Sequence, residues 1–134
     1  MAAQNLETAR RGYEHFIATG DVLDEVFHPD FVLDMSTFQG WPERPTYQGI
    51  DGLREFLADW LGSWDDFEFE VIDLRDADGD VVVALLRQRG RAKGSGVPVD
   101  MERAHVLTYR DGKQIGTEMY ASHAEGLFAA GLGP

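Results

Sequence analysis

The chain has 134 residues, 43% of them hydrophobic and 11% aromatic, and its formal net charge is -12. This length and composition predict a single globular domain over residues 1–134. The acidic excess repels polyanions such as DNA and anionic membrane surfaces at long range, so neither nucleic acid nor a membrane is expected as a partner. The absence of cysteine excludes disulfides, a thiol nucleophile and thiolate metal ligands.

The N-terminal residues and the longest apolar run both lead us to expect a soluble, cytoplasmic protein. Residues 1–5 have neither the basic segment nor the apolar segment of a signal peptide. The longest apolar run, Val81 to Leu86, is far too short to span a bilayer.

The first half of the chain has mainly helical periodicity. Apolar residues recur at helical spacing over residues 6–17, with Asn5 as a candidate N-cap and Gly20 after the last turn. A short second helix is expected over residues 22–27, and a short strand over residues 31–34.

An ordered loop is expected over residues 35–49, which are rich in Pro, Gly and Trp. The apolar stripe from Leu53 to Trp64 then predicts a strongly amphipathic helix.

The second half of the chain changes to strand-like alternation. Strands are expected over four segments, residues 67–74, 81–91, 97–109 and 113–121. The short turns between them predict an antiparallel meander. A short helix over residues 125–130 would end at Gly131. Helices followed by long hairpins indicate the α+β class.

Four stretches carry a resemblance to a known family: residues 11–16 with 20–23, residues 27–31, residues 47–56 and residues 109–113. Together with the order of elements, they resemble the SnoaL-like, ketosteroid isomerase-like branch of the nuclear transport factor 2-like superfamily. The resemblance implies an α+β, cystatin-like fold in which a cone-shaped, curved and mainly antiparallel sheet wraps on the N-terminal helices and encloses a pocket. Its members include isomerases, polyketide cyclases, hydrolases, dehydratases and non-enzymatic binding domains, so function has to be argued from the site.

Strand alternation places Met101, Arg103 and His105 on one face of their strand. By the resemblance, the hydrogen-bonding acid of ketosteroid isomerase falls at His105, and the Arg-x-Asp of limonene epoxide hydrolase falls on Arg103 and His105, which turns this face into the cone. Histidine can donate or accept a proton near neutral pH, so His105 is the first catalytic candidate. The alternative is a core histidine bonded to a neighbour.

Two further catalytic candidates come from the first half of the chain. Asp34 ends the first strand, where the family places a polar pocket residue, and would orient His105 or relay its proton; the alternative is a carboxylate bonded to backbone N–H groups of the next loop. Tyr13 matches the helical tyrosine of the ketosteroid isomerase oxyanion hole, and would stabilise an oxyanion as Arg103 would. A core tyrosine with a hydrogen-bonded hydroxyl is the other possibility.

The remaining candidates would bind the ligand. Aromatic side chains that could line an apolar pocket or pack in the core are Trp41, Phe56, Trp60 and Trp64. Met101 lies on the face of His105. Arg87 either reaches the pocket to hold an oxyanion or belongs to a solvated outer face. On the last strand, Glu118 and Met119 point to opposite faces, and alternation alone leaves open which one points inward.

These observations predict a cofactor-free acid–base enzyme of isomerase, cyclase or hydrolase type, acting on a small, largely apolar and polycyclic or polyketide-like molecule. The alternative is a non-catalytic ligand-binding or accessory domain of the same fold, so enzymatic activity itself is left open. The four histidines have no metal-ligand spacing, so no metal is expected. A homodimer through the exposed outer face of the sheet is also expected.

Overall fold

The computed structural model describes residues 2–38, 45–77 and 80–132. Its elements in chain order are α1 (Ala2–Thr19), the 3-10 turn η1 (Asp24–Val26), β1 (Phe27–Asp34), β2 (Thr46–Gln48), α2 (Gly49–Leu61), β3 (Trp64–Asp76), β4 (Val81–Ala92), β5 (Pro98–Arg110), β6 (Lys113–Tyr120) and α3 (His123–Ala129).

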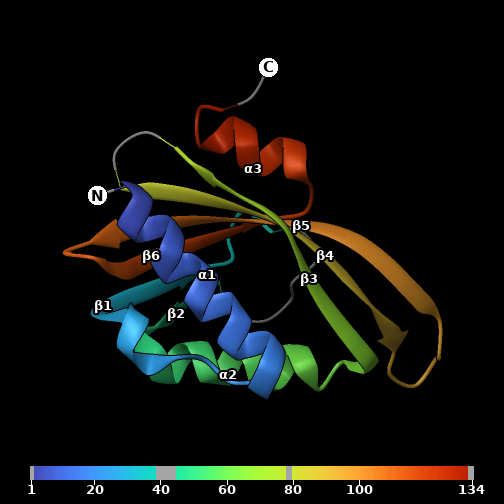
Figure 1. Cartoon of the computed structure of the whole chain (residues 1–134). Coiled ribbons are helices and arrows are strands. Elements are labelled where there is room, and N and C mark those ends of the chain that lie inside the picture. The colour runs from blue at the N-terminus through green and yellow to red at the C-terminus, as the bar shows by residue number, and fades with distance from the viewer. Residues whose placement is uncertain (1, 39–44, 78–79, 133–134) are drawn as a thin grey trace.

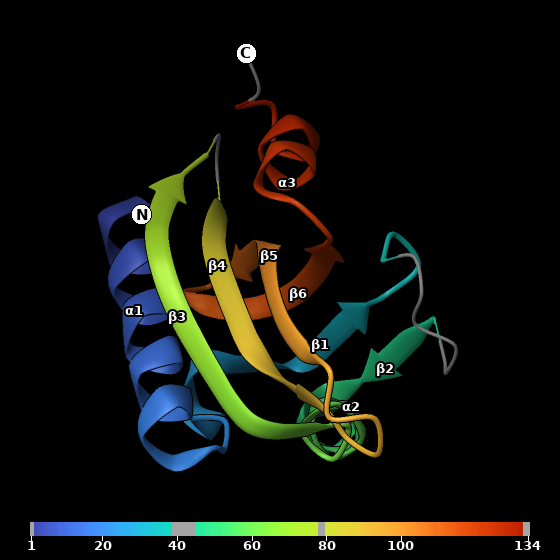
Figure 2. The ribbon, with the colours of Figure 1, turned by 90° about the vertical axis from the view of Figure 1, so that its right-hand side faces the viewer.

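The strands join into one sheet in the order β2-β1-β6-β5-β4-β3. The pairs within β3 to β6 are antiparallel, as is β1 with β2, whereas β1 and β6 run parallel. Figures 1 and 2 show the sheet curving strongly across its width. The α+β class and the curved, mainly antiparallel sheet predicted from the sequence are therefore confirmed.

Helices cover both faces of this sheet. On the concave face, Ala9 of α1 packs against Val82 of β4 and Leu107 of β5, and Phe56 of α2 belongs to the cluster built on β1 and β2. On the convex face, Leu127 of α3 packs against a separate cluster. The inner face of β4 and β5 therefore packs against α1 along one part of its length. Farther along the strands this face is open.

Four local expectations need correction. The segment over residues 35–49 is not all loop, because residues 46–48 form β2 and pair with residues 32–34 of β1. Asn5 is not an N-cap, because α1 begins at Ala2 and the buried Asn5 amide reaches Asp80 at 3.5 Å, across the β3–β4 turn. The second helix is only the 3-10 turn η1, because Phe27 already pairs with Gln114 of β6. Trp64 begins β3 rather than ending α2, since α2 stops at Leu61.

Among the described residues, no helix combines the length and the apolar character needed to cross a bilayer.

The docking of α3 depends on a close approach at Gly126. A Cβ atom at this position would lie 2.4 Å from Cβ of Ala104 in β5, and neither atom belongs to a flexible side chain. We expect Gly126→Ala to destabilise the protein by about 1–3 kcal/mol through this overlap, measured by urea unfolding. Adding Ala104→Gly should recover part of the loss, because it removes the opposing methyl group. Unchanged stability in Gly126→Ala would contradict this packing.

Candidate functional site

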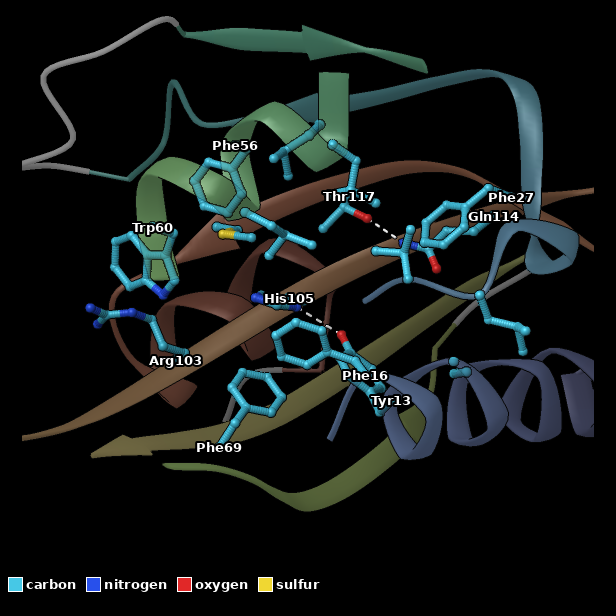
Figure 3. A pocket seen from close by; sticks show the side chains of 18 of the residues that line it. Tyr13, Phe16, Phe27, Phe56, Trp60, Phe69, Arg103, His105, Gln114 and Thr117 are labelled. Atoms are coloured by element: carbon cyan, nitrogen blue, oxygen red, sulfur yellow. Dashed lines mark hydrogen bonds between the residues drawn. The ribbon is translucent and has the colours of Figure 1, made fainter. Parts of the chain in front are cut away.

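A cavity lies between the concave face of the sheet and helices α1 and α2 (Figure 3). The space inside it that the centre of a water-sized molecule can occupy is about 110 Å³, and the cavity opens to solvent at its mouth. Most of the wall is aliphatic or aromatic, and no carboxylate is among the described residues that line it. The polar side chains on the wall are Tyr13, Gln88, Arg103, His105, Gln114 and Thr117.

The hydroxyl of Tyr13 and the ring of His105 are hydrogen-bonded inside this cavity. Tyr13 Oη lies 2.7 Å from His105 Nδ1, and the bond connects α1 to β5. Phe69 of β3 completes the cluster, with its ring centroid 6.0 Å from that of Tyr13 and 6.5 Å from that of His105. The aromatic contacts and the hydrogen bond together fix the orientation of the imidazole.

Burial keeps both partners of this bond uncharged at neutral pH. Loss of solvent around His105, with a smaller effect of the nearby Arg103 cation, lowers the histidine pKa from 6.5 to about 3. The accessible part of the imidazole faces the cavity rather than open solvent. Burial also raises the pKa of Tyr13 well above 10.0.

Two tautomers of neutral His105 satisfy the bond. When Tyr13 Oη–H donates to Nδ1, the histidine proton sits on Nε2; when Nδ1–H donates to Tyr13 Oη, Nε2 is an acceptor. No residue of the described ranges makes a hydrogen bond to Nε2, and Figure 3 shows this side of the ring turned toward the cavity. The pair can therefore present either a donor or an acceptor to a bound molecule.

Arg103 lies on the same face of β5 and is 7% exposed. Its guanidinium carbon is 4.6 Å from the ring centroid of Phe38 and 5.4 Å from that of Trp60. Nη1 donates to the carbonyl oxygen of Glu102 at 2.9 Å, and Nη2 lies 3.1 Å from Sδ of Met101. Nε has no hydrogen-bond partner among the residues that the structure describes. Burial lowers the Arg103 pKa to about 10, which leaves the side chain charged at pH 7.

Gln88 of β4 is a cavity residue that the sequence analysis missed. Its side chain is 2% exposed, and Oε1 accepts a hydrogen bond from Nε1 of Trp60 at 3.1 Å. Its Nε2 has no hydrogen-bond partner in the described part of the chain. Strand alternation could have predicted its position, because Gln88 continues the inward-facing series of Val82, Ala84 and Leu86.

The register of β6 decides which of its side chains face the cavity. Met119 pairs with His105 and Thr117 with Leu107, so these side chains point inward and Glu118 points to the opposite face. A register irregularity after Thr108 also turns Gln114 inward, where its Nε2 donates to Oγ1 of Thr117. Gln114 was missed because a bulge cannot be located from alternation alone, whereas alternation does place Thr117 on the same face as Met119.

Several predicted site residues lie away from the cavity. Oδ1 of Asp34 accepts hydrogen bonds from the amide and hydroxyl groups of Ser36, at 2.9 and 2.6 Å, so Tyr13 rather than Asp34 is the partner of His105. Arg87 lies on the outer face and pairs with Asp100 at 2.7 Å.

The remaining predicted residues divide in the same way. Phe56 and Trp60 line the cavity, as does Met119. Met101 contacts Arg103 but does not line the cavity. Trp41 lies outside the described residues. In the described ranges, no group of three or more His, Cys, Asp or Glu side chains is arranged to hold a metal ion.

The low pKa of His105 predicts a pH-dependent stability. Below pH 6.5 the unfolded chain takes up a proton that the folded chain excludes down to about pH 3. The stability present above pH 6.5 is therefore lost as the pH falls, by up to about 1.4 kcal/mol per pH unit for this one group. Urea unfolding between pH 7.5 and 4.5 should show a steeper loss for the wild type than for His105→Asn. Parallel curves for the two proteins would contradict the burial of a neutral histidine.

Comparison with known proteins identifies the family. A model of the SnoaL-like domain matches residues 9–115. TerC, crystallised with polyporic acid, is 22% identical with a TM-score of 0.73, and the match covers 89% of this chain and 92% of that chain. Bal32a, from a soil-derived mobile gene cassette, is 19% identical with a TM-score of 0.74 and coverages of 96% and 97%.

A protein with a ketosteroid isomerase-like fold from Catenulispora acidiphila, in complex with trimethylamine, is 18% identical with a TM-score of 0.64, covering 90% of this chain and 92% of that chain. No match is found among curated protein sequences. The structural likenesses, at these identities, show a shared fold. Since the family model spans most of its length, the chain belongs to the SnoaL-like domain family.

Proposed function

We propose that this protein binds a small, largely apolar, ring-containing molecule in its cavity and transfers protons on it without a cofactor. The observation that carries the proposal is the 2.7 Å bond between Tyr13 and His105 in the wall of an otherwise mostly apolar cavity. A polar pair of this kind, oriented by packing and open on one side to a ligand, is what acid–base catalysis requires. The reaction would be of isomerase, cyclase or hydrolase type on a polycyclic or polyketide-like substrate.

The chemistry would use His105 in its neutral form. With Tyr13 donating to Nδ1, the Nε2–H group of His105 can donate to a substrate carbonyl and make an adjacent C–H group more acidic. In the other tautomer, Nε2 can accept the proton that the substrate loses, and the resulting imidazolium keeps its Nδ1–H hydrogen-bonded to the Tyr13 hydroxyl oxygen. Arg103, two residues along the same strand face, would stabilise the negative charge that develops on the oxygen.

The residue roles differ from those expected from the sequence. Tyr13 takes the orienting role given to Asp34, since Asp34 is held by Ser36. Phe56, Trp60 and Met119 would contact the apolar body of the ligand.

A non-catalytic binding domain is the second candidate, and one observation favours it. A histidine whose pKa is about 3 is a weak base in the empty site, and no carboxylate is among the described lining residues to raise it. The solved structures of TerC with polyporic acid and of the Catenulispora protein with trimethylamine support small-molecule binding in this fold under either candidate.

Ligand titrations followed by kinetics separate the two candidates. Aromatic ketones, sterols and polyketide-like compounds should change the fluorescence of Trp60, because a ligand displaces water from the indole. With a compound that is turned over, His105→Asn should lower the rate by about 10²- to 10⁴-fold while binding is retained. Tyr13→Phe should also lower the rate, since it leaves Nδ1 without its partner.

The matched control is His15→Asn, because His15 lies on the same helix as Tyr13 and does not line the cavity. This variant should bind and react as the wild type does. Saturable binding without turnover across the panel would favour the non-catalytic candidate. Turnover by His105→Asn at the wild-type rate would contradict the assignment of proton transfer to His105.

The expected homodimer through the outer sheet face, like the expected cytoplasmic location, stays a prediction. The prediction rests on a partly apolar outer face, of which α3 covers only the part around Val83 and Leu85. Light scattering at micromolar concentration should give twice the chain mass of 15.0 kDa. A monomer under these conditions would contradict the prediction.

A further inference from the structure

We infer that the cavity receives a ligand with an anionic oxygen, a carboxylate or an ionised enol or phenol, and that Arg103 and Gln88 hold this oxygen. The inference rests on the proposed function and deepens it, since it names the charge of the ligand and the part of the cavity that binds it.

The first observation is a buried cation that nothing in the described chain neutralises. Arg103 is 7% exposed, yet no carboxylate of the described residues lies within ion-pair distance of its guanidinium group, and Nε makes no hydrogen bond. Its polar contacts with described residues are one carbonyl oxygen and one thioether sulfur. A buried charge without a counter-ion is costly, so such an arrangement is expected where a partner arrives from outside.

Exposed arginines outside the cavity show how this chain pairs such side chains elsewhere. Arg87 is bonded through Nε and Nη2 to the two carboxylate oxygens of Asp100, at 2.7 and 3.1 Å. Arg54 pairs with both Asp21 and Asp24. In a chain with net charge -12, carboxylates are abundant, yet none of those in the described residues lies within ion-pair distance of Arg103.

The second observation is the unpaired amide of Gln88. The indole N–H of Trp60 can only donate, so the atom that it meets on Gln88 must be the carbonyl oxygen, and the NH₂ group is the end left over. This Nε2 is buried, on a side chain that is 2% exposed, and has no partner within residues 2–38, 45–77 and 80–132. An unsatisfied buried donor next to a cavity indicates an acceptor that belongs to a ligand.

The two donors belong to the same end of the cavity. Arg103 pairs with Leu86 across β4 and β5, and Gln88 is two residues farther on the same face, so the two side chains are diagonal neighbours. Trp60 touches both, through its hydrogen bond to Gln88 and through its ring against the guanidinium of Arg103. The rest of the wall is mainly apolar, so the ligand would be an aromatic or alicyclic acid with its charged oxygen at this end.

Matched pairs of ligands test the charge requirement. Benzoate, 2-naphthoate and anthracene-2-carboxylate would be titrated at pH 8 beside their primary amides, and 4-nitrophenolate beside 4-nitroanisole, with calorimetry as the readout. We expect an anion to bind at least about tenfold more tightly than its neutral partner, as charge-assisted hydrogen bonds would give. The carboxylate and phenolate pairs distinguish the two sources of the anionic oxygen.

Two substitutions test whether Arg103 and Gln88 cause the preference for anionic ligands. Arg103→Gln removes the cation and should bring the anion and its neutral partner to within about twofold. Gln88→Glu keeps an acceptor for Trp60 but places a carboxylate beside Arg103, so it should also remove the preference. As a control, Arg87→Gln on the outer face should leave the preference unchanged.

Protein stability separates ligand binding from a structural role. Arg103→Met removes a buried, unneutralised charge, so its melting temperature should equal or exceed that of the wild type. A lower melting temperature with an unchanged anion preference would overturn the inference. Equal wild-type binding of anions and neutral partners would overturn it too, while leaving the proposed binding cavity intact. Binding of neither kind of compound would contradict the proposed function as well.

Discussion

The hydrogen bond between Tyr13 and His105 holds the first helix and the fifth strand together at the wall of the cavity. It joins residues 92 positions apart in the chain, and it can form only if α1 lies across the concave face of the sheet. Ala9, one turn earlier in α1, packs on Val82 and Leu107, so the helix is positioned by its own apolar stripe before the polar bond is made. The geometry of the site therefore depends on ordinary core packing next to it.

Arginine side chains have different surroundings on the two faces of β4 and β5. On the convex face, arginine and acidic side chains pair in solvent, where such pairs contribute little to stability. On the concave face, Arg103 keeps its charge with two aromatic rings and a carbonyl oxygen as its main neighbours. Cation–π contacts offset only part of the lost hydration of a buried cation. Burial of the Arg103 cation therefore lowers the stability of the protein, whereas the paired arginines of the convex face do not have this cost.

How far the sequence predicts this protein depends on the kind of signal. The amphipathic stripe of α2 and the alternation in β4 and β5 predict the α+β fold, and alternation correctly puts Arg103 and His105 on one face. The boundary at Trp64 was missed, because an apolar residue in step with a helical stripe can equally begin a strand. This error in a helix boundary is local and leaves the fold class unchanged.

The pairing of side chains was less predictable than their faces. Asp34 was expected beside His105 because it ends β1, but a short carboxylate at a strand end finds the nearest loop donors, here those of Ser36. Tyr13 was foreseen as an oxyanion donor and not as the partner of the histidine. Gln88 was overlooked because the basic residues on the other face of its strand dominate the sequence pattern.

If the proposed anion binds, it also changes the histidine. Burial and the positive charge of Arg103 both lower the pKa of His105 in the empty cavity. An anionic oxygen at Arg103 would cancel the field of the guanidinium, and its own negative charge would favour the protonated imidazole. The pKa of His105 would therefore rise when the site is filled, although the loss of water around the ring would oppose this. A histidine that is a poor base in the empty cavity would become a better one beside the ligand on which it acts, so that proton transfer would be coupled to binding of the correct charge.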